Sequence, residues 1–481
     1  MGISRRKRKT RRKLEDSESR DIISSLPDEL LGKILSCLPT KYAVATTVLS
    51  SRWKNLYKHT TTLDFDDSTY LYPRKNLGNG RRNDNASFRE FVNKVLGECK
   101  SKISKFRLKC GDNIEFYLIH DWINAVFTHK IAEFELSVLD MRIPCVLQLC
   151  KLNCENLVVL RLDGELILRV PKSVTFPRLQ VLVFKGIMFH GSSSIRFNAY
   201  CKSSSDNHSL NGILLGCPLL KELVIEGCDW NGGDLYFTNP LLRSLTFHAG
   251  IGGPLDQLNG CTIYMDLPNL VQFNYFECLA EQYEIRNLNS VREAQVDIHF
   301  NDDEFEEQDL CDAILDLITG VYCCQSLHLS SQCLEALTSG EFELPIFRNL
   351  TQLTLALGYD VSWNDVLLDF LNSSPSLESL TLVQGFLQRW QCSQPDDDEF
   401  LIKDEEVPPC VKFRLKFINI KDFRGFKGEM QMIIYFLENA NILEEMVLHW
   451  DKRKRAKKFA AKEEEILELA KSSESCTIAF K

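Results

Sequence analysis

The sequence predicts an α/β fold in three parts: an N-terminal three-helix module, a solenoid of repeats with parallel strands, and a C-terminal α/β domain. Three observations support this prediction. Apolar residues recur at helical spacing in three short segments between Asp21 and Phe65. An L-x-x-L-x-L motif then recurs, with conservative replacements, between residues 101 and 393. From residue 394 the chain becomes acidic, and it then resumes with short strand and helix patterns.

The first helix of the N-terminal module is predicted to begin near Ser25. Ser25 and Asp28 have the spacing of a capping box, and Pro27 falls in the first turn, where its missing N–H costs nothing. Pro39 is expected to end the helix, because proline cannot donate the next hydrogen bond and clashes with the preceding turn. The apolar stripe of this helix consists of Leu30, Leu31, Ile34, Leu35 and Leu38.

Two more helices are predicted in the same module. Thr40 can cap the second helix. A third helix presents Trp53, Leu56 and Tyr57 at positions i, i+3 and i+4. The inner face of the second helix is expected to hold Ala43, Val44, Thr47 and Val48. A module this short cannot bury all of this apolar surface, so we expect part of it to bind another protein.

The module resembles an F-box. The resemblance rests on LPDELL at residues 26–31 and on the motifs that follow it, which are Ile34-Leu35, Leu38-Pro39, Val44, Leu49-Ser50 and Arg52-Trp53-Lys54-Asn55-Leu56. It implies docking onto the Skp-type adaptor of a Skp–cullin–F-box ubiquitin ligase. The implied adaptor-binding residues are Leu26, Pro27, Leu30, Leu31, Ile34, Leu38, Pro39, Val44, Leu49, Trp53 and Leu56. Helical spacing alone would also fit an ordinary three-helix core element, but the order of the motifs favours the F-box.

The segment after the module predicts an exposed loop and then a helix. Residues 69–85 are rich in Gly, Asn and charge. The next apolar residues have helical spacing and are expected to close the end of the solenoid; they are Phe88, Phe91, Val92, Val95 and Leu96.

The repeated motif predicts a stack of short strands. Each strand points alternate apolar residues inward and cannot bury that face without its neighbours, so stacking produces a curved parallel sheet. The motif begins at Ile103, Ile131, Leu157, Leu179, Leu220, Leu242, Leu270, Val291, Cys324, Leu350 and Leu377, and can be extended to Cys410 and Leu443.

This pattern resembles a degenerate leucine-rich repeat array. Cys228 and Cys278 fall where such repeats place Asn or Cys to hydrogen-bond the turning backbone. The alternative, scattered buried strands of an unrelated α/β domain, remains open for any single motif, because only the recurrence is specific.

The C-terminal segment is predicted to form an α/β domain. Val407 to Cys410 is expected to lead into a strand, a helix follows with Met430 and Leu437 on one face, and Cys476 to Phe480 alternates like a final strand. The strings VPPC, FRGFKG, YFLENANILEEMVL and the closing CTIAF resemble an FBD domain, the C-terminal companion of F-box and leucine-rich segments in a large plant family. The predicted domains are 1–20 (basic tail), 21–66 (F-box), 67–100 (loop and capping helix), 101–393 (solenoid) and 394–481 (acidic linker and FBD-type domain).

Charge is distributed unevenly along the chain. Residues 1–20 hold nine Lys/Arg and three Asp/Glu, so of the 57 basic and 66 acidic residues the remainder keeps 48 and 63, a net charge of −15. Such a run is typical of a nuclear-import signal, a nucleic-acid arm or a merely solvated tail, and the acidic body argues against a nucleic-acid-reading domain. The predicted nuclear-targeting residues are Arg5, Arg6, Lys7, Arg8, Lys9, Arg11, Arg12 and Lys13.

No pattern in the sequence predicts catalysis, a cofactor or a metal site. The chain has no Gly-rich phosphate loop, no G-x-S-x-G, no H-E-x-x-H and no CxxC, and its 18 cysteines are scattered. We expect reduced, mostly buried thiols. No apolar run approaches the roughly 18 residues of a membrane span, and no secretory signal is expected.

These observations favour a non-catalytic substrate receptor: the F-box binds the Skp-type adaptor, and through it cullin, and the repeats hold an unknown target protein. The alternative is a nuclear scaffold or regulator that binds the adaptor without cullin; a small-molecule co-receptor is a third hypothesis, suggested only by other F-box and leucine-rich chains. The target is expected on the concave strand face, where the residues between the buried positions point outward. The predicted target-binding residues are Glu222, Glu226, Gln272, Asn274, Glu293, Gln295 and Asp297.

Overall fold

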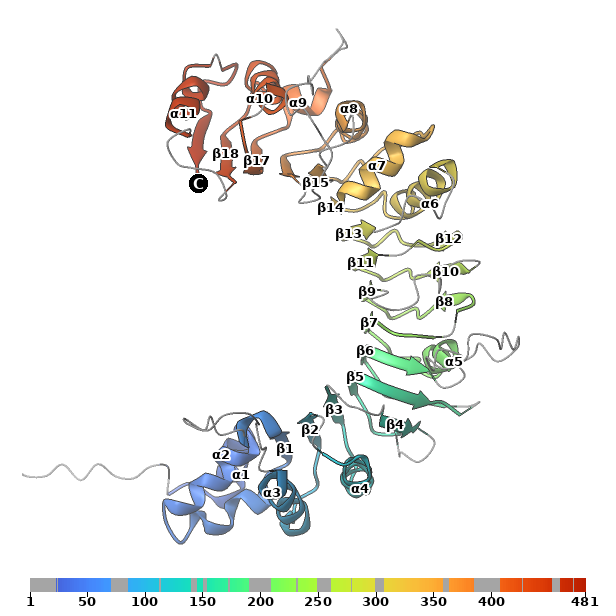
Figure 1. The fold of residues 1–481 in the computed structure, drawn as a ribbon, viewed down its shortest axis with the longest axis vertical. Coiled ribbons are helices and arrows are strands. Elements are labelled where there is room, and N and C mark those ends of the chain that lie inside the picture. Colours follow the sequence, from blue (N-terminus) through green and yellow to red (C-terminus); the bar gives the residue numbers. More distant parts are fainter. Residues whose placement is uncertain are drawn as a thin grey trace, which may run out of the picture.

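The structure is a computed structural model. It describes residues 23, 25–70, 85–111, 114–139, 145–149, 154–171, 174–189, 209–230, 232–248, 261–277, 279–298, 307–357, 363–384, 407–425, 427–451, 459–469 and 471–481. The described chain forms a horseshoe, with strands along its inner side, helices mainly on its outer side and the N-terminal helices at one end (Figure 1). The predicted basic tail, Cys278 and the acidic linker lie outside the described residues.

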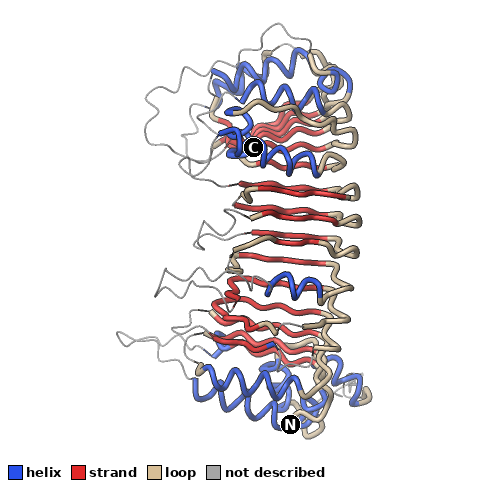
Figure 2. The backbone as a smooth tube through the Cα atoms, turned by 90° about the vertical axis from the view of Figure 1, so that its right-hand side faces the viewer, coloured by secondary structure: helices blue, strands red, loops and turns tan. Residues whose placement is uncertain are grey.

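One parallel sheet runs through the whole horseshoe, and its strands stack as rungs (Figure 2). Its 16 strands include β4 (Cys145–Gln148), which pairs only with β5. The other strands follow in spatial order: β1 (Thr62–Asp66), β2 (Lys105–Cys110), β3 (Glu133–Val138), β5 (Val159–Arg169), β6 (Val181–Phe189), β7 (Glu222–Glu226), β9 (Ser244–His248), β11 (Gln272–Glu277), β13 (Glu293–Ile298), β14 (Ser326–Leu329), β15 (Gln352–Leu357), β16 (Ser379–Gln384), β17 (Phe417–Phe423), β18 (Glu445–Trp450) and β19 (Thr477–Phe480).

The predicted solenoid of parallel strands is confirmed. Motif after motif from Ile103 to Leu377 contains a strand, because its alternate apolar side chains are buried while the residues between them are more accessible. In β7, for example, Leu223 and Ile225 are fully buried and lie beside Leu245 and Phe247 of β9.

Crossover helices on the outer side cover the two ends of the sheet (Figure 1). They are α3 (Asn85–Glu98), α4 (Phe116–Phe127), α5 (Ser209–Leu215), α6 (Glu307–Gly320), α7 (Ser331–Ser339), α8 (Trp363–Ser373), α9 (Pro409–Phe413), α10 (Lys427–Asn439) and α11 (Phe459–Leu467). In the middle, a three-stranded parallel sheet of β8 (Leu235–Phe237), β10 (Thr262–Asp266) and β12 (Gln282–Arg286) takes their place. The helix predicted around Phe88 is α3, where Phe88 and Val92 are buried.

The motif assigned to Cys410, Phe413 and Leu415 is wrong. Residues 409–413 form α9, which Pro408 and Pro409 suit because a proline is tolerated at a helix start, and Phe413 is exposed. The strand lies five residues later, where Leu415, Ile418 and Ile420 repeat the same spacing and are buried.

The C-terminal segment continues the solenoid. β17 pairs with β16 from Phe417 to Lys421, and β18 and β19 follow in the same sheet. A single apolar core cluster extends from Tyr57 to Cys476. The predicted C-terminal FBD-type domain therefore packs as the last rungs of the same stack.

The described cysteines are free, and most are buried. Cys228 matches its predicted role, because its Sγ donates to the backbone oxygens of Phe184, at 3.4 Å, and Glu226, at 3.6 Å. Burial raises the pKa of the Cys228 thiol to about 12, so the group stays protonated and keeps this donor role.

Candidate functional site

The N-terminal module consists of four short helical segments. These are α1 (Asp28–Leu35), α2 (Thr40–Ala45), the 3₁₀ helix η1 (Thr46–Val48) and the 3₁₀ helix η2 (Trp53–His59). Buried side chains from these segments form a small core separate from that of the solenoid. It consists of Leu31, Leu35, Ala43, Trp53 and Leu56, with Leu26 packed against it. The three predicted helical segments are thus present, and the third is a 3₁₀ helix.

The helix starts differ from the sequence prediction. The N-cap residue of α1 is Pro27, which is extended and offers no side-chain cap, rather than Ser25, as the Ser25–Asp28 spacing predicted. Arg52 holds this end instead: its Nη2 lies 2.8 Å from Asp28 Oδ1 and also donates to the Leu26 carbonyl. Likewise, the hydroxyl of Thr40 does not cap α2 but accepts the N–H of Asp64 at 2.7 Å.

Val48 does not lie on the inner face of the second helix, as predicted, but is 85% exposed. The cause is the end of α2 at Ala45, after which the chain tightens into η1 and rotates Val48 and the following Leu49 outward. A sequence pattern read at 3.6 residues per turn cannot anticipate this change of helix type.

The module presents an exposed apolar surface to solvent, although it is attached to a well-packed solenoid. We call it the apolar face of the module. Among the described residues of the module, its large exposed apolar side chains are Ile23, Leu30, Ile34, Leu38, Tyr42, Val48 and Leu49. A short module with this many large apolar side chains exposed is typical of a protein-interaction site rather than of a free surface.

The structure divides the eleven predicted adaptor-binding residues into three groups. Pro27, Leu30, Ile34, Leu38, Pro39 and Leu49 are exposed, whereas Leu31, Trp53 and Leu56 are buried and Leu26 and Val44 are half-buried. The buried residues hold the helices that present the exposed ones. The apolar face also contains Ile23, Tyr42 and Val48, which were not among the predicted adaptor-binding residues. For Tyr42, the sequence offered one signal, an apolar side chain next to the basic Lys41.

The module is bonded to the end of α3, the helix that covers the start of the solenoid. Lys100 N donates to Lys58 O at 2.9 Å, and Lys58 Nζ lies 3.3 Å from Glu98 Oε2. The hydroxyl of Tyr57 donates to the same Glu98 carboxylate. Burial and this hydrogen bond raise the pKa of Tyr57 to about 12, while the bond from Tyr57 lowers the pKa of Glu98. The apolar face is therefore held in a fixed orientation relative to the strands.

The predicted target-binding residues lie on the concave face but not all on adjacent rungs. Gln272 and Glu293 are register partners on β11 and β13, as are Asn274 and Gln295. Glu222 and Glu226 lie on β7, and β9 lies between β7 and β11. No residue of β9 was among the predicted target-binding residues.

Several of these side chains bind one another or their neighbours. Glu226 pairs with Lys185, Gln272 Nε2 donates to Glu293 Oε2 at 3.0 Å, and Asn274 Nδ2 donates to Thr246 Oγ1 at 3.2 Å. Ion pairs also join the first strands of the sheet: Arg107 of β2 pairs with both Asp64 and Glu135. The concave face is thus a ladder of mixed charges rather than a uniformly acidic surface.

The part of the chain that the structure describes contains no cluster of three or more His, Cys, Asp or Glu side chains arranged to hold a metal ion. Among the same residues, no helix combines the length and the apolar character of a membrane span.

Comparisons with known proteins agree with this architecture. The F-box domain model matches residues 23–56, and the FBD model matches residues 403–448. F-box/LRR-repeat protein At4g14096 of Arabidopsis thaliana is 32% identical over 445 residues, covering 90% of this chain and 89% of its own. F-box/LRR-repeat protein At3g59200 of the same plant is 30% identical over 469 residues, covering 91% of this chain and 83% of its own. A third Arabidopsis relative, At3g59240, whose name adds FBD to F-box and LRR-repeat, is 28% identical over 459 residues, covering 92% of this chain and 86% of its own.

Proposed function

The chain belongs to the F-box/LRR-repeat proteins with a C-terminal FBD segment, and from this membership we propose that it is the substrate-recognition subunit of a Skp–cullin–F-box ubiquitin ligase. Proteins of this family are adaptors rather than enzymes, with a general role in substrate recognition. In the proposal, the F-box binds a Skp-type adaptor, the adaptor links it to cullin, and the repeats hold a target protein for ubiquitin transfer by other subunits.

The observation that carries this proposal is the apolar face of the module. Leu30 and Ile34 are each close to half exposed, one turn apart on α1, and Leu49 is 64% exposed at the end of η1. Full burial of an exposed side chain of this kind contributes roughly 1.5–3 kcal/mol, and a side chain that is already half buried contributes about half as much. The proposed adaptor surface combines these residues with Pro27, Leu38 and Pro39, and the buried Leu31, Trp53 and Leu56 support it from within.

The test replaces Leu30 by Asp together with Pro27 by Ala. Both positions are exposed, so the fold is expected to persist, while a charge in a desolvated apolar contact is expected to remove adaptor binding, at a cost of several kcal/mol. The matched control is Phe413→Asp, because Phe413 is an exposed apolar residue of the last rungs. Adaptor pull-down is the measurement; undiminished capture by the double variant would refute the adaptor surface.

Cullin decides between the ligase and a scaffold role. We expect both the adaptor and cullin to co-purify with the wild-type chain. Neither should co-purify with the Leu30→Asp, Pro27→Ala variant. Adaptor without cullin would instead favour a regulator outside any ligase.

We also propose that the basic run from Arg5 to Lys13 directs the protein to the nucleus. The support is compositional: eight basic residues occupy nine positions in front of an acidic body. A fluorescent fusion lacking residues 1–20 is expected to leave the nucleus while still binding the adaptor. Continued nuclear accumulation would assign the run a merely solvated role.

The concave strand face stays our proposed target surface. Its support is the register that places Gln272 beside Glu293 and Asn274 beside Gln295. Among the described residues, Glu222 and Gln295 make no side-chain hydrogen bond or ion pair and are free to contact a target. Glu226 and Asp297 extend this surface along β7 and β13.

A further inference from the structure

A polar groove with a volume of about 440 Å³ lies at the edge of the main sheet where the strands begin. Its walls are the turns that lead into β9, β11, β13, β14 and β15. Two arginines, Arg243 and Arg292, and two amides, Asn289 and Gln325, are exposed in it. We call it the edge groove.

Hydrogen bonds between successive turns fix the walls of the edge groove. Asn269 Nδ2 donates to Pro240 O at 2.8 Å, and Ser290 Oγ donates to Pro268 O at 2.6 Å. Asn349 Nδ2 continues the series by donating to Cys323 O at 3.3 Å. The groove is therefore pre-formed, which lowers the entropy cost of binding.

The two arginines of the edge groove are unpaired. Among the described residues, Arg243 and Arg292 make no ion pair and no side-chain hydrogen bond. The carboxylate of Glu293, next to Arg292 in the chain, instead accepts Nε2 of Gln272. In a body with excess negative charge, two unpaired guanidinium groups facing one groove form a site for a carboxylate-bearing ligand.

Beyond the edge groove, two exposed leucines lie along the same edge of the main sheet. In the turn before β11, Asn269 follows a proline. Leu219 and Leu241 occupy the equivalent position in the turns before β7 and β9, also directly after a proline. The two leucine side chains are about 40% exposed. From the turn before β7 to the turn before β15 there are five steps between paired strands, which span roughly 24 Å at about 4.8 Å each. An extended peptide covers this length with about seven residues.

We propose that the edge groove binds an extended acidic peptide segment of the target protein, with an aliphatic side chain on Leu219 and Leu241 and carboxylates on Arg243 and Arg292. This inference rests on the proposed function, because it names the segment by which the repeats capture their target. Arg243 and Arg292 lie two strand steps apart, roughly 9–10 Å, so each guanidinium group can hold its own carboxylate. The amides of Asn289, in the same turn as Arg292, and of Gln325, one strand step beyond it, are available to the peptide backbone.

The test is selection from a random octapeptide display library on the purified full chain. We expect selected peptides to be rich in Asp and Glu next to an aliphatic residue. A synthetic peptide from the selection should bind the Arg243→Gln, Arg292→Gln variant about tenfold or more weakly, since a charged hydrogen-bonded pair contributes at least the roughly 1.4 kcal/mol that equals a factor of ten. Raising the salt concentration should weaken binding to the wild type more than to the variant.

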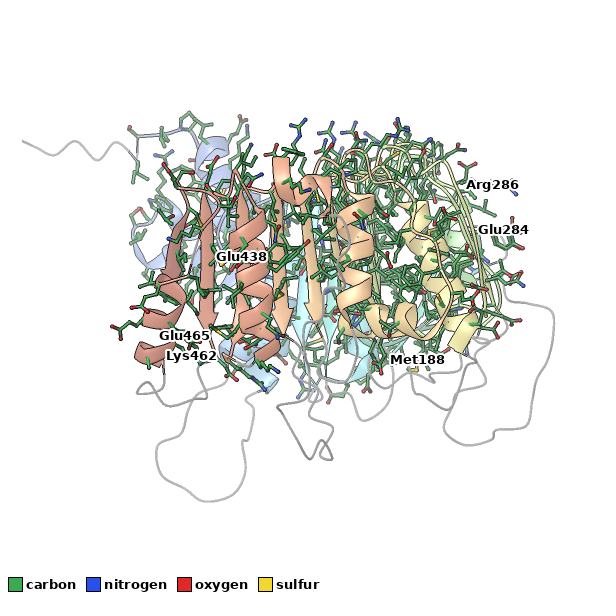
Figure 3. The ribbon with its side chains drawn as sticks, turned by 90° about the horizontal axis from the view of Figure 1, so that it is seen from above. Met188, Glu284, Arg286, Glu438, Lys462 and Glu465 are labelled. Carbon is green, nitrogen blue, oxygen red and sulfur yellow. The ribbon has the colours of Figure 1, made fainter. Side chains whose placement is uncertain are left out.

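The matched control is Arg286→Gln with Lys462→Gln, which removes the same charge elsewhere. Arg286 pairs with Glu284 on β12 and Lys462 pairs with Glu465 on α11, and both lie on the outside of the molecule, away from the concave face (Figure 3). This variant should bind the peptide within about twofold of the wild type. No acidic enrichment, or equal affinity of the groove and control variants, would overturn the inference.

Adaptor pull-down with the same variants separates this inference from the proposed function. The groove variant should retain the adaptor, because the edge groove and the apolar face share no residue. If the wild type fails to bind the adaptor, the proposed function fails while peptide selection still decides the role of the edge groove.

Discussion

At the scale of single residues, the charge that the sheet presents to a partner depends on which polar side chains are paired with one another. Arg107 has two carboxylate neighbours and Gln272 donates to Glu293, whereas Arg243 and Arg292 at the edge remain unpaired among the described residues. Surface pairs of this kind contribute only about 0–1 kcal/mol each to stability. Their arrangement therefore matters more for which partner is attracted than for whether the chain folds.

His328 is the residue at which stability should respond to mild acid. It lies in the middle of β14, between Gln295 and Thr354 in the register, and burial lowers its pKa below the ordinary 6.5; Lys421 also lowers the pKa, while Asp297 raises it. The folded-state pKa is below the unfolded one, so the unfolded chain binds the proton more tightly. Its contribution to stability is present above about pH 6.5 and is lost as pH falls from there toward the folded-state pKa.

We therefore expect His328→Gln to reduce the acid sensitivity of the protein. The free energy of unfolding in urea, measured at about pH 7.5 and about pH 5.5, should fall less in the variant than in the wild type. Equal losses in the two proteins would show that protonation of His328 is not coupled to folding.

At the scale of elements, β5 shows how one strand can pair with two different strands along one edge and with a third, β6, along the other. Its first half pairs with β3, its second half pairs with β4, and the register with β6 shifts between Asp163 and Leu166. Gly164 makes the shift possible: its φ is +110°, and a Cβ there would lie 1.8 Å from Val138 O. Only glycine fits such a site, because the conformation and the close backbone approach both exclude a side chain.

Gly164→Ala should destabilise the protein strongly. Strain at a positive φ costs on the order of 1–3 kcal/mol, and the contact with Val138 adds to it. The control is Gly97→Ala in α3, where a Cβ meets nothing within 4 Å; a helix gains about 0.5–1 kcal/mol from this change. Urea unfolding should show opposite signs for the two variants, and a neutral Gly164→Ala would mean that β5 can repack without its shift.

At the scale of the whole molecule, the F-box and the FBD segment are attached to a single stack of strands. The F-box leads directly into β1, and β17 to β19 extend the sheet beyond β16. A solenoid needs closed ends, because an open rung exposes both its apolar face and unpaired backbone groups. The FBD segment supplies that closure after β16.

Ending the chain after Gln384 should therefore cause aggregation. The truncation would expose the edge of β16 and leave Leu382 without its register partner Ile420. Size-exclusion chromatography should show loss of monomer, and hydrogen exchange should show loss of protection in β15 and β16. Removal of residues 1–20 is the control and should leave the monomer fraction unchanged. A soluble, protected truncation would indicate that the FBD segment is an independent unit.

Short-range patterns were sufficient to predict most of the elements. The L-x-x-L-x-L spacing located the strands of the main sheet from β2 to β16 except β4, because the burial of alternate residues follows directly from the sequence. It did not locate β8, β10 and β12 of the smaller sheet. The order of LPDELL, LP and RW likewise predicted an F-box, which the matching model at residues 23–56 confirms. The errors came where a short segment fits two patterns, as with Cys410 to Leu415, or where the helix type changes, as at Val48.

By itself, the sequence determined the class of fold, the two recognised segments and the apolar composition of the F-box. Tertiary structure alone decided which of those apolar residues face solvent, that the FBD strands join the main sheet, and that Arg243 and Arg292 share one groove although 48 other residues separate them in the chain. The physical reason is the distance over which each interaction acts. Alternation and helical spacing are local properties of the chain, whereas exposure, pairing between rungs and shared grooves depend on strands that stacking brings together from distant positions.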